Sequence, residues 1–123
     1  MQNTTTAPNI ADMIELAHSI PEAPSDFDTM ADVRAANAAR GNYFFDREAM
    51  REFNSVIEST VYRGGVFITS EQIEIGRHRE PRRYSLRVAD RAGAIHTLEG
   101  KFSHIEDARQ AARAVSRALT ATN

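Results

Sequence analysis

The chain has 123 residues, of which 41% are hydrophobic and 26% charged, with 15 basic and 17 acidic side chains and a formal net charge of −2. This length fits one domain, and the lack of cysteine excludes disulfides, thiolate metal sites and cysteine nucleophiles. No run of about 18 apolar residues indicates a membrane span, and the first twenty residues do not resemble a secretory signal, so we expect a cytoplasmic protein without membrane contact.

The first helix is predicted after a polar lead-in. Residues 1–8 (MQNTTTAP) are polar and threonine-rich, so we expect them to be disordered. Asn9 is a suitable N-cap for a helix that runs to about Ser19. Its apolar positions recur at the spacing of one helix face: Ile10, Met13, Ile14 and Ala17. Pro21 and Pro24 mark its end.

A second, alanine-rich helix is expected to end at about Ala39. Asp26 or Asp28 is the predicted N-cap, because a short acidic side chain can accept a hydrogen bond from the free backbone N–H groups of the first turn. Gly41 follows the last helical residue, where glycine is the usual residue type.

The charge is divided unevenly along the chain. Residues 1–33 carry −6, since they hold six acids and no lysine or arginine: Asp12, Glu15, Glu22, Asp26, Asp28 and Asp32. The rest of the chain carries +4, from 15 bases and 11 acids, and 14 of these bases are arginine. We therefore expect residues 9–40 to form an acidic helical segment in front of an α+β domain at 41–123. This segment either docks on the basic domain or reaches out to a partner.

An aromatic segment and one helix are predicted next. The segment 42–45 (NYFF) is typical of a strand or of an extended lead packed on the core. Asp46 can cap a helix over residues 47–58, and one face of this helix is apolar: Met50, Phe53 and Ile57. The Gly64-Gly65 pair is expected to allow a turn before the next element.

The pattern then predicts an antiparallel meander of three strands. Residues 66–75 are rich in β-branched side chains, residues 82–88 alternate, and residues 94–99 form the third strand. Residues 76–81 form a polar turn. In the second strand one side is apolar (Tyr84, Leu86, Val88) and the other polar (Arg83, Ser85, Arg87).

The last helix is predicted from a capping box in which Ser103 accepts a backbone N–H and Glu106 reaches back. An apolar stripe follows: Ile105, Ala108, Ala112, Val115 and Leu119. The order of elements predicts an α+β fold, with a three-stranded antiparallel sheet that carries a central and a C-terminal helix on one face. A homodimer that completes the small core is a further alternative.

The residues give little support for catalysis. The four histidines, His18, His78, His96 and His104, show no metal-binding spacing, and neither a phosphate-binding loop nor a serine-nucleophile motif occurs. His96 and His104, with Glu99 and Asp107, are the one set to weigh for acid–base chemistry, and ordinary surface and strand positions explain them more simply. We predict no enzymatic activity, no cofactor and no metal.

The positive signal is a group of arginines around the predicted hairpin turn: Arg77, Arg79, Arg82, Arg83 and Arg87. Guanidinium groups suit both phosphates and an acidic protein surface. The plain alternative is that they form exposed pairs with Glu71, Glu74 and Glu80. Tyr84 is the only aromatic residue near enough to stack on a base. We predict that these arginines, or the acids Asp26, Asp28 and Asp32, contact a partner.

Three segments resemble a family of small uncharacterised proteins of bacterial, phage and plasmid genomes. They are an F-F-x4-M-R-x-F-x-S block within residues 41–55, F-x-T-S-E at 67–71 and R-x-Y-x-x-R at 82–87. The resemblance covers about residues 41–115 and implies no assigned reaction. It implies an accessory role in a mobile element, namely non-catalytic binding of a host protein or nucleoprotein, for example to inhibit host defence. The alternative is direct nucleic-acid binding by the arginine-rich hairpin.

Overall fold

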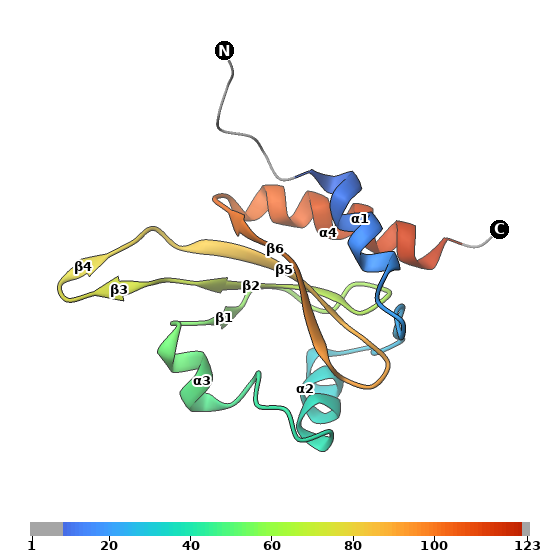
Figure 1. Ribbon diagram of the computed structural model, residues 1–123, viewed down its shortest axis with the longest axis horizontal. Coiled ribbons are helices and arrows are strands. Elements are labelled where there is room, and N and C mark those ends of the chain that lie inside the picture. Colours follow the sequence, from blue (N-terminus) through green and yellow to red (C-terminus); the bar gives the residue numbers. More distant parts are fainter. Residues whose placement is uncertain (1–8, 122–123) are drawn as a thin grey trace, which may run out of the picture.

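The structure is a computed structural model that describes residues 9–121, so the lead-in at 1–8 lies outside the described residues. The described chain forms a mixed α+β fold (Figure 1). Its elements in chain order are α1 (Ile10–His18), α2 (Met30–Ala39), α3 (Arg47–Glu52), β1 (Val56–Ile57), β2 (Val66–Glu71), β3 (Glu74–Ile75), β4 (His78–Arg79), β5 (Arg83–Ala89), β6 (Ile95–Phe102) and α4 (Ile105–Thr120).

The main sheet is antiparallel and has the strand order β1-β2-β5-β6, so it holds four strands where three were predicted. The additional strand, β1, occupies residues that were predicted to continue the third helix. That helix ends early because Asn54 adopts a positive φ of 50°. The Asn54 side chain donates to the carbonyl of Gln72 at 2.8 Å, which directs the following β-branched pair Val56-Ile57 alongside β2.

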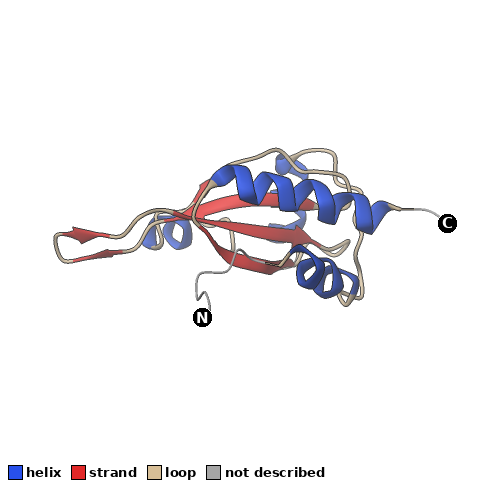
Figure 2. Ribbon diagram, turned by 90° about the horizontal axis from the view of Figure 1, so that it is seen from above, coloured by secondary structure: helices blue, strands red, loops and turns tan. Residues whose placement is uncertain are grey.

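The middle strands form one long hairpin. β2 and β5 pair from Val66↔Val88 to Glu71↔Arg83, and β3 and β4 then form a separate two-stranded sheet. The polar turn predicted at residues 76–81 is therefore partly strand. Figure 2 shows this distal part of the hairpin as a narrow extension beyond the helices.

Helices cover both faces of the sheet, whereas the sequence predicted them on one face. α1 and α4 lie together on one side, and α2 and α3 lie on the other (Figure 1). The reason is visible in β2, whose residues Val66 to Ser70 are all buried, so that both of its faces require cover.

Each face has its own apolar core. The α1/α4 side contains Met13, Ala17, Ile20, Val66, Ile68, Leu86, Val88, Leu98, Phe102, Ala108, Ala111, Ala112, Val115 and Leu119. The other side contains Val33, Phe45, Phe67 and Ala89. The segment 9–40 contributes to both cores, so these helices dock on the sheet, a choice that the sequence left open.

The helix ends agree in part with the predictions. Asn9 caps α1 by accepting from the backbone N–H of Ala11 at 2.9 Å. α2 is capped by Thr29, whose hydroxyl accepts from Asp32 N at 3.1 Å, and not by either predicted aspartate. The segment 42–45 is not a strand, and it packs on the sheet through the buried side chain of Phe45.

The predicted capping box of the last helix is wrong, because α4 begins after His104, which makes no side-chain cap hydrogen bond. The apolar stripe is confirmed: Ala108, Ala112, Val115 and Leu119 are buried, and Ile105 is half-buried. Burial of this stripe, and not the cap, holds the helix on the sheet.

Candidate interaction surface

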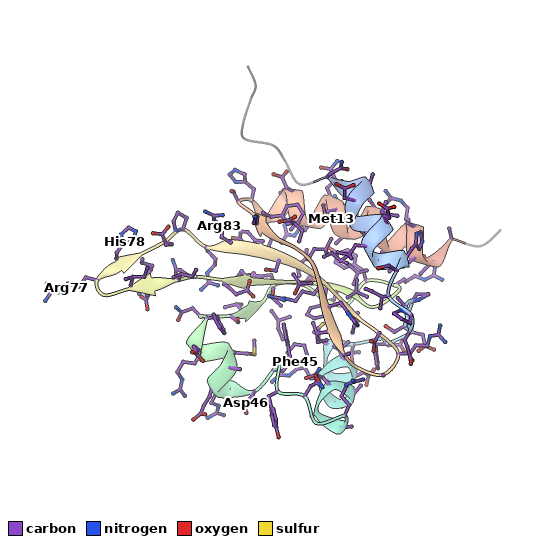
Figure 3. All side chains as sticks on the ribbon, in the orientation of Figure 1. Met13, Phe45, Asp46, Arg77, His78 and Arg83 are labelled. Atoms are coloured by element: carbon purple, nitrogen blue, oxygen red, sulfur yellow. The ribbon has the colours of Figure 1, made fainter. Side chains whose placement is uncertain are left out.

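The distal end of the long hairpin extends beyond the helices (Figure 2). We call this segment, residues 73–79, the arm. All seven residues are exposed. β3 and β4 pair only with each other here, through Glu74↔Arg79 and Ile75↔His78. Arg77 and His78 lie at its tip and point away from the rest of the molecule (Figure 3). The arm is thus a two-stranded ribbon that extends into solvent.

The base of the arm is braced by neighbouring segments. The backbone N–H of Glu80 donates to the Ile73 carbonyl at 2.9 Å, which closes the ribbon. Gln72 donates its side-chain amide to the Glu80 carbonyl at 3.1 Å and its backbone N–H to the Phe53 carbonyl at 3.0 Å. An isolated two-stranded hairpin is marginal in water. These bonds and the continuous strands β2 and β5 therefore set the direction of the arm.

Two large apolar side chains lie on the arm. Ile73 is 57% exposed and Ile75 is 68% exposed. Sequence reasoning assigned both to a strand of the sheet and did not identify them as surface residues. The signal was the alternation Ile73-Glu74-Ile75, which continues the strand pattern beyond Glu71, where the helices no longer cover the hairpin.

The charges of the arm are largely balanced. Arg79 pairs with Glu74 at 2.6 Å, and the His78 Nε2 atom lies 2.5 Å from Glu80 Oε2. Residues 73–80 contain two arginines and two glutamates, so their net charge is zero with histidine neutral. The alternative of exposed pairs, raised from the sequence, is therefore confirmed for Glu74 and Arg79.

Arg87, predicted as a partner-binding residue, is turned toward the sheet. Its Nη2 atom lies 3.1 Å from Glu71 Oε2, and the two side chains are only 13% and 20% exposed. Its Nε donates to the Thr69 hydroxyl at 2.8 Å, and its Nη1 donates to the Thr97 hydroxyl at 2.5 Å. The guanidinium carbon lies 4.8 Å from the centre of the Phe44 ring, which covers it. Arg87 is thus held within the fold by these contacts.

Arg82 is also held within the fold. Its Nη1 donates to the Asn54 carbonyl at 2.9 Å and to the Ser70 hydroxyl at 2.7 Å. The buried Ser70 hydroxyl donates in turn to Glu58 at 2.6 Å. Arg83, by contrast, is exposed at the base of the arm (Figure 3). Of the five predicted arginines, Arg77, Arg79 and Arg83 are thus exposed and two are embedded in polar networks.

The acidic side chains predicted as partner contacts lie elsewhere. Asp26 and Asp28 border a hollow beside Arg63 and Arg91, at the end of β2 opposite to the arm. Asp32 is exposed in the first turn of α2. The acidic and basic groups therefore do not form one site.

The histidine set considered for catalysis is not brought together. His96 is the second residue of β6 and His104 is the N-cap of α4, so nearly the whole length of the strand separates them. His96 Nε2 lies 2.8 Å from Asp90 Oδ2, and the other oxygen of Asp90 accepts from Ala92 N and Ala94 N. Burial raises the pKa of Asp90, but the hydrogen bonds from His96 and these backbone groups outweigh it, so the pKa lies below its usual value. The pair stabilises the β5–β6 turn.

Two features are absent from residues 9–121. Within this range, no three histidine, aspartate or glutamate side chains lie close enough together to hold a metal ion. None of the helices described there combines the length and the apolar character that crossing a bilayer requires.

A comparison with protein families identifies one relationship. Residues 29–116 match a family model described as "Family of unknown function (DUF7447)". No curated protein matches the chain, and neither does a solved structure. The matched residues run from the cap of α2 through the sheet and the arm to α4. The family has no assigned reaction or partner, so the mobile-element role stays a prediction. Because the match covers most of its length, the chain belongs to the DUF7447 family of unknown function.

Proposed function

We propose that the chain is a non-catalytic binding protein that holds a protein partner through the arm, with Ile73 and Ile75 as apolar anchors. The observation that carries this proposal is the exposure of both isoleucines on a projecting ribbon without net charge. Large apolar side chains gain free energy when a partner covers them, and a few such residues commonly dominate an interface.

The arm is suited to binding because its shape is set before the partner arrives. Covering one isoleucine side chain completely is worth about 1.5–3 kcal/mol. Ordering a flexible loop on binding would offset much of this gain. The hydrogen bonds of Gln72 and Glu80 at the base of the arm remove part of that ordering cost.

A protein partner is favoured over nucleic acid by the charges of the arm. Phosphate binding gains from cations that release counterions, and base stacking needs aromatic side chains. Residues 73–80 have zero net charge with histidine neutral and contain no phenylalanine, tyrosine or tryptophan. Arg77 and Arg83, both exposed, then serve as polar contacts at the rim of the apolar patch.

A photo-crosslinking amino acid placed at Ile75 in the full chain tests this proposal. The matched control carries the same group at Leu16, which is 45% exposed on α1. Both proteins are irradiated in lysate of the source cell, with and without nuclease. We expect a discrete protein adduct at position 75 that survives nuclease and is absent from position 16. Adducts to nucleic acid at position 75, or the same adducts at both positions, would overturn the proposal.

The partner identified in this way allows a quantitative test of the anchors. The double variant Ile73→Ser/Ile75→Ser is expected to lower affinity at least tenfold, because it removes the apolar area that the partner covers. Leu16→Ser is expected to leave affinity unchanged. Both substitutions lie on exposed positions, so thermal unfolding should show that the fold is retained.

A further inference from the structure

An open hollow of about 600 Å³ lies between α2, α3 and the start of β1, on the face opposite to α1 and α4. Four of its lining residues are arginines: Arg34 from α2, Arg47 and Arg51 from α3, and Arg82, which directly precedes β5. No lining residue is acidic. We call this feature the arginine hollow. It is distinct from the arm, and only Arg82 was singled out from the sequence.

The spacing of charges along α3 explains why the hollow is purely basic. Arg47 and Arg51 are four residues apart and therefore share a face of the helix, with Met50 between them. Glu48 and Glu52 are also four residues apart and lie on the adjacent flank, outside the lining. The helix thus presents its cations to the hollow and its carboxylates elsewhere.

Two of the arginines are held in place. The Nη1 group of Arg82 is fixed by the Asn54 carbonyl and the Ser70 hydroxyl. The guanidinium carbon of Arg34 lies 5.7 Å from the centre of the Phe45 ring, a distance at which the ring face attracts a cation. These cations are positioned in advance, which lowers the ordering cost of binding an anion.

Among the described residues, no carboxylate forms an ion pair with the arginines of the hollow, and Arg82 reaches Glu58 only through the Ser70 hydroxyl. Across the described part of the chain, the ion pairs do not include Arg34, Arg47, Arg51 or Arg82. Arg79 on the arm, Arg87 on the sheet and Arg109 on α4, by contrast, each form an ion pair with a glutamate. Four like charges around one hollow repel each other, and a multiply charged anion would relieve this repulsion.

We propose that the arginine hollow binds a small organic phosphate of nucleotide size. The guanidinium fork matches two phosphate oxygens at once, and four such groups suit a ligand with more than one phosphate. Met50 is half-buried and Val56 is 44% exposed at the edge of the hollow, so they offer an apolar surface to the organic part. The volume is within the usual range of small-molecule sites. This inference does not depend on the proposed role of the arm.

Isothermal titration of the full chain with four probes tests the proposal: ATP, pyrophosphate, inorganic phosphate and adenosine. We expect the affinity to fall in that order, with no binding of adenosine, and to weaken as salt rises. The variant Arg47→Gln/Arg51→Gln should lose at least tenfold in affinity for ATP. Arg113→Gln/Arg117→Gln is the matched control, since it removes two exposed arginines at the same spacing from α4. This control should bind ATP like the unaltered chain.

Three results would overturn the proposal. The first is that none of the phosphate probes binds. The second is an equal loss of ATP affinity in the α3 double variant and in the α4 control. The third is binding of single-stranded oligonucleotides without binding of ATP. The last result would assign the hollow to nucleic acid. Arg34→Gln is a second variant on a different helix, which guards against misfolding of α3. It should weaken ATP binding severalfold while the unfolding temperature stays unchanged.

Discussion

At the scale of single residues, burial separates two ion pairs of the same chemical type. Glu71 and Arg87 are mostly buried, and Glu71 also accepts hydrogen bonds from the hydroxyls of Thr69 and Ser85 at 2.7 Å. Glu74 and Arg79 on the arm are 42% and 64% exposed and compete with water. An exposed pair of this kind is worth little, whereas a mostly buried charge that loses its partner is costly.

We therefore predict that Glu71→Gln lowers the free energy of unfolding by about 1.5–3 kcal/mol, because the guanidinium of Arg87 keeps its burial and loses its counter-charge. The matched change Glu74→Gln should cost less than about 1 kcal/mol. Urea unfolding of both variants measures the difference. Equal losses of unfolding free energy in the two variants would show that the Glu71 network stabilises the fold no more than the exposed pair does.

At the scale of elements, α2 is attached to the sheet through the turn between β5 and β6. The buried Asn37 side chain donates to the Gly93 carbonyl at 2.8 Å. Gly93 has a φ of +92°, and a Cβ built on it would lie 2.6 Å from the backbone carbon of Ala36. Glycine is required at this position both by the backbone conformation and by the closeness of the helix.

Gly93→Ala is accordingly expected to destabilise the fold by at least about 2–3 kcal/mol, because the methyl group forces α2 away from the turn. Gly41→Ala is the control. Gly41 also has a positive φ, of +85°, but a Cβ there meets no atom within 4 Å, so it should cost only about 1 kcal/mol of backbone strain. Thermal unfolding of the two variants distinguishes steric from conformational cost. A loss at Gly93 no larger than that at Gly41 would contradict the close packing of α2.

At the scale of the whole molecule, the structural unit is larger than the family match. The matched residues begin at Thr29, yet α1 lies before them and packs against α4. Met13, Ala17 and Ile20 are buried in the core between α1, α4 and the sheet. Removal of the segment before Thr29 would therefore uncover one apolar face of the sheet and α4.

Met13→Ala tests this contribution and should lower the free energy of unfolding by about 2–5 kcal/mol, because it leaves a cavity in the core. Leu16→Ala, on the exposed side of the same helix, should change it by no more than about 0.5 kcal/mol. Both values come from denaturant unfolding of the full chain. A loss at Met13 no larger than about 0.5 kcal/mol would contradict its contribution to the core.

The candidate sites show where sequence reasoning stopped. It singled out the arginines of the hairpin, but it could not separate the exposed Arg77 from the embedded Arg82 and Arg87. That separation depends on Asn54, Ser70 and Thr97, which approach these arginines from other segments. The arginine hollow was missed for the same reason, since its four cations come from two helices and the segment before β5, which meet only in the folded chain.

Local pattern determined much of the secondary structure: the cap at Asn9, the alternation of β5 and the apolar stripe of α4 all follow from side-chain spacing within one segment. Tertiary structure decided that a fourth strand forms, that helices cover both faces of the sheet, and how far the arm extends beyond them. These depend on contacts between distant segments, such as Asn54 with Gln72 and Asn37 with Gly93. A periodic pattern specifies which side of an element is buried, because that depends on its own residues. It does not specify which other element covers that side, because the free energy of that contact belongs to both partners.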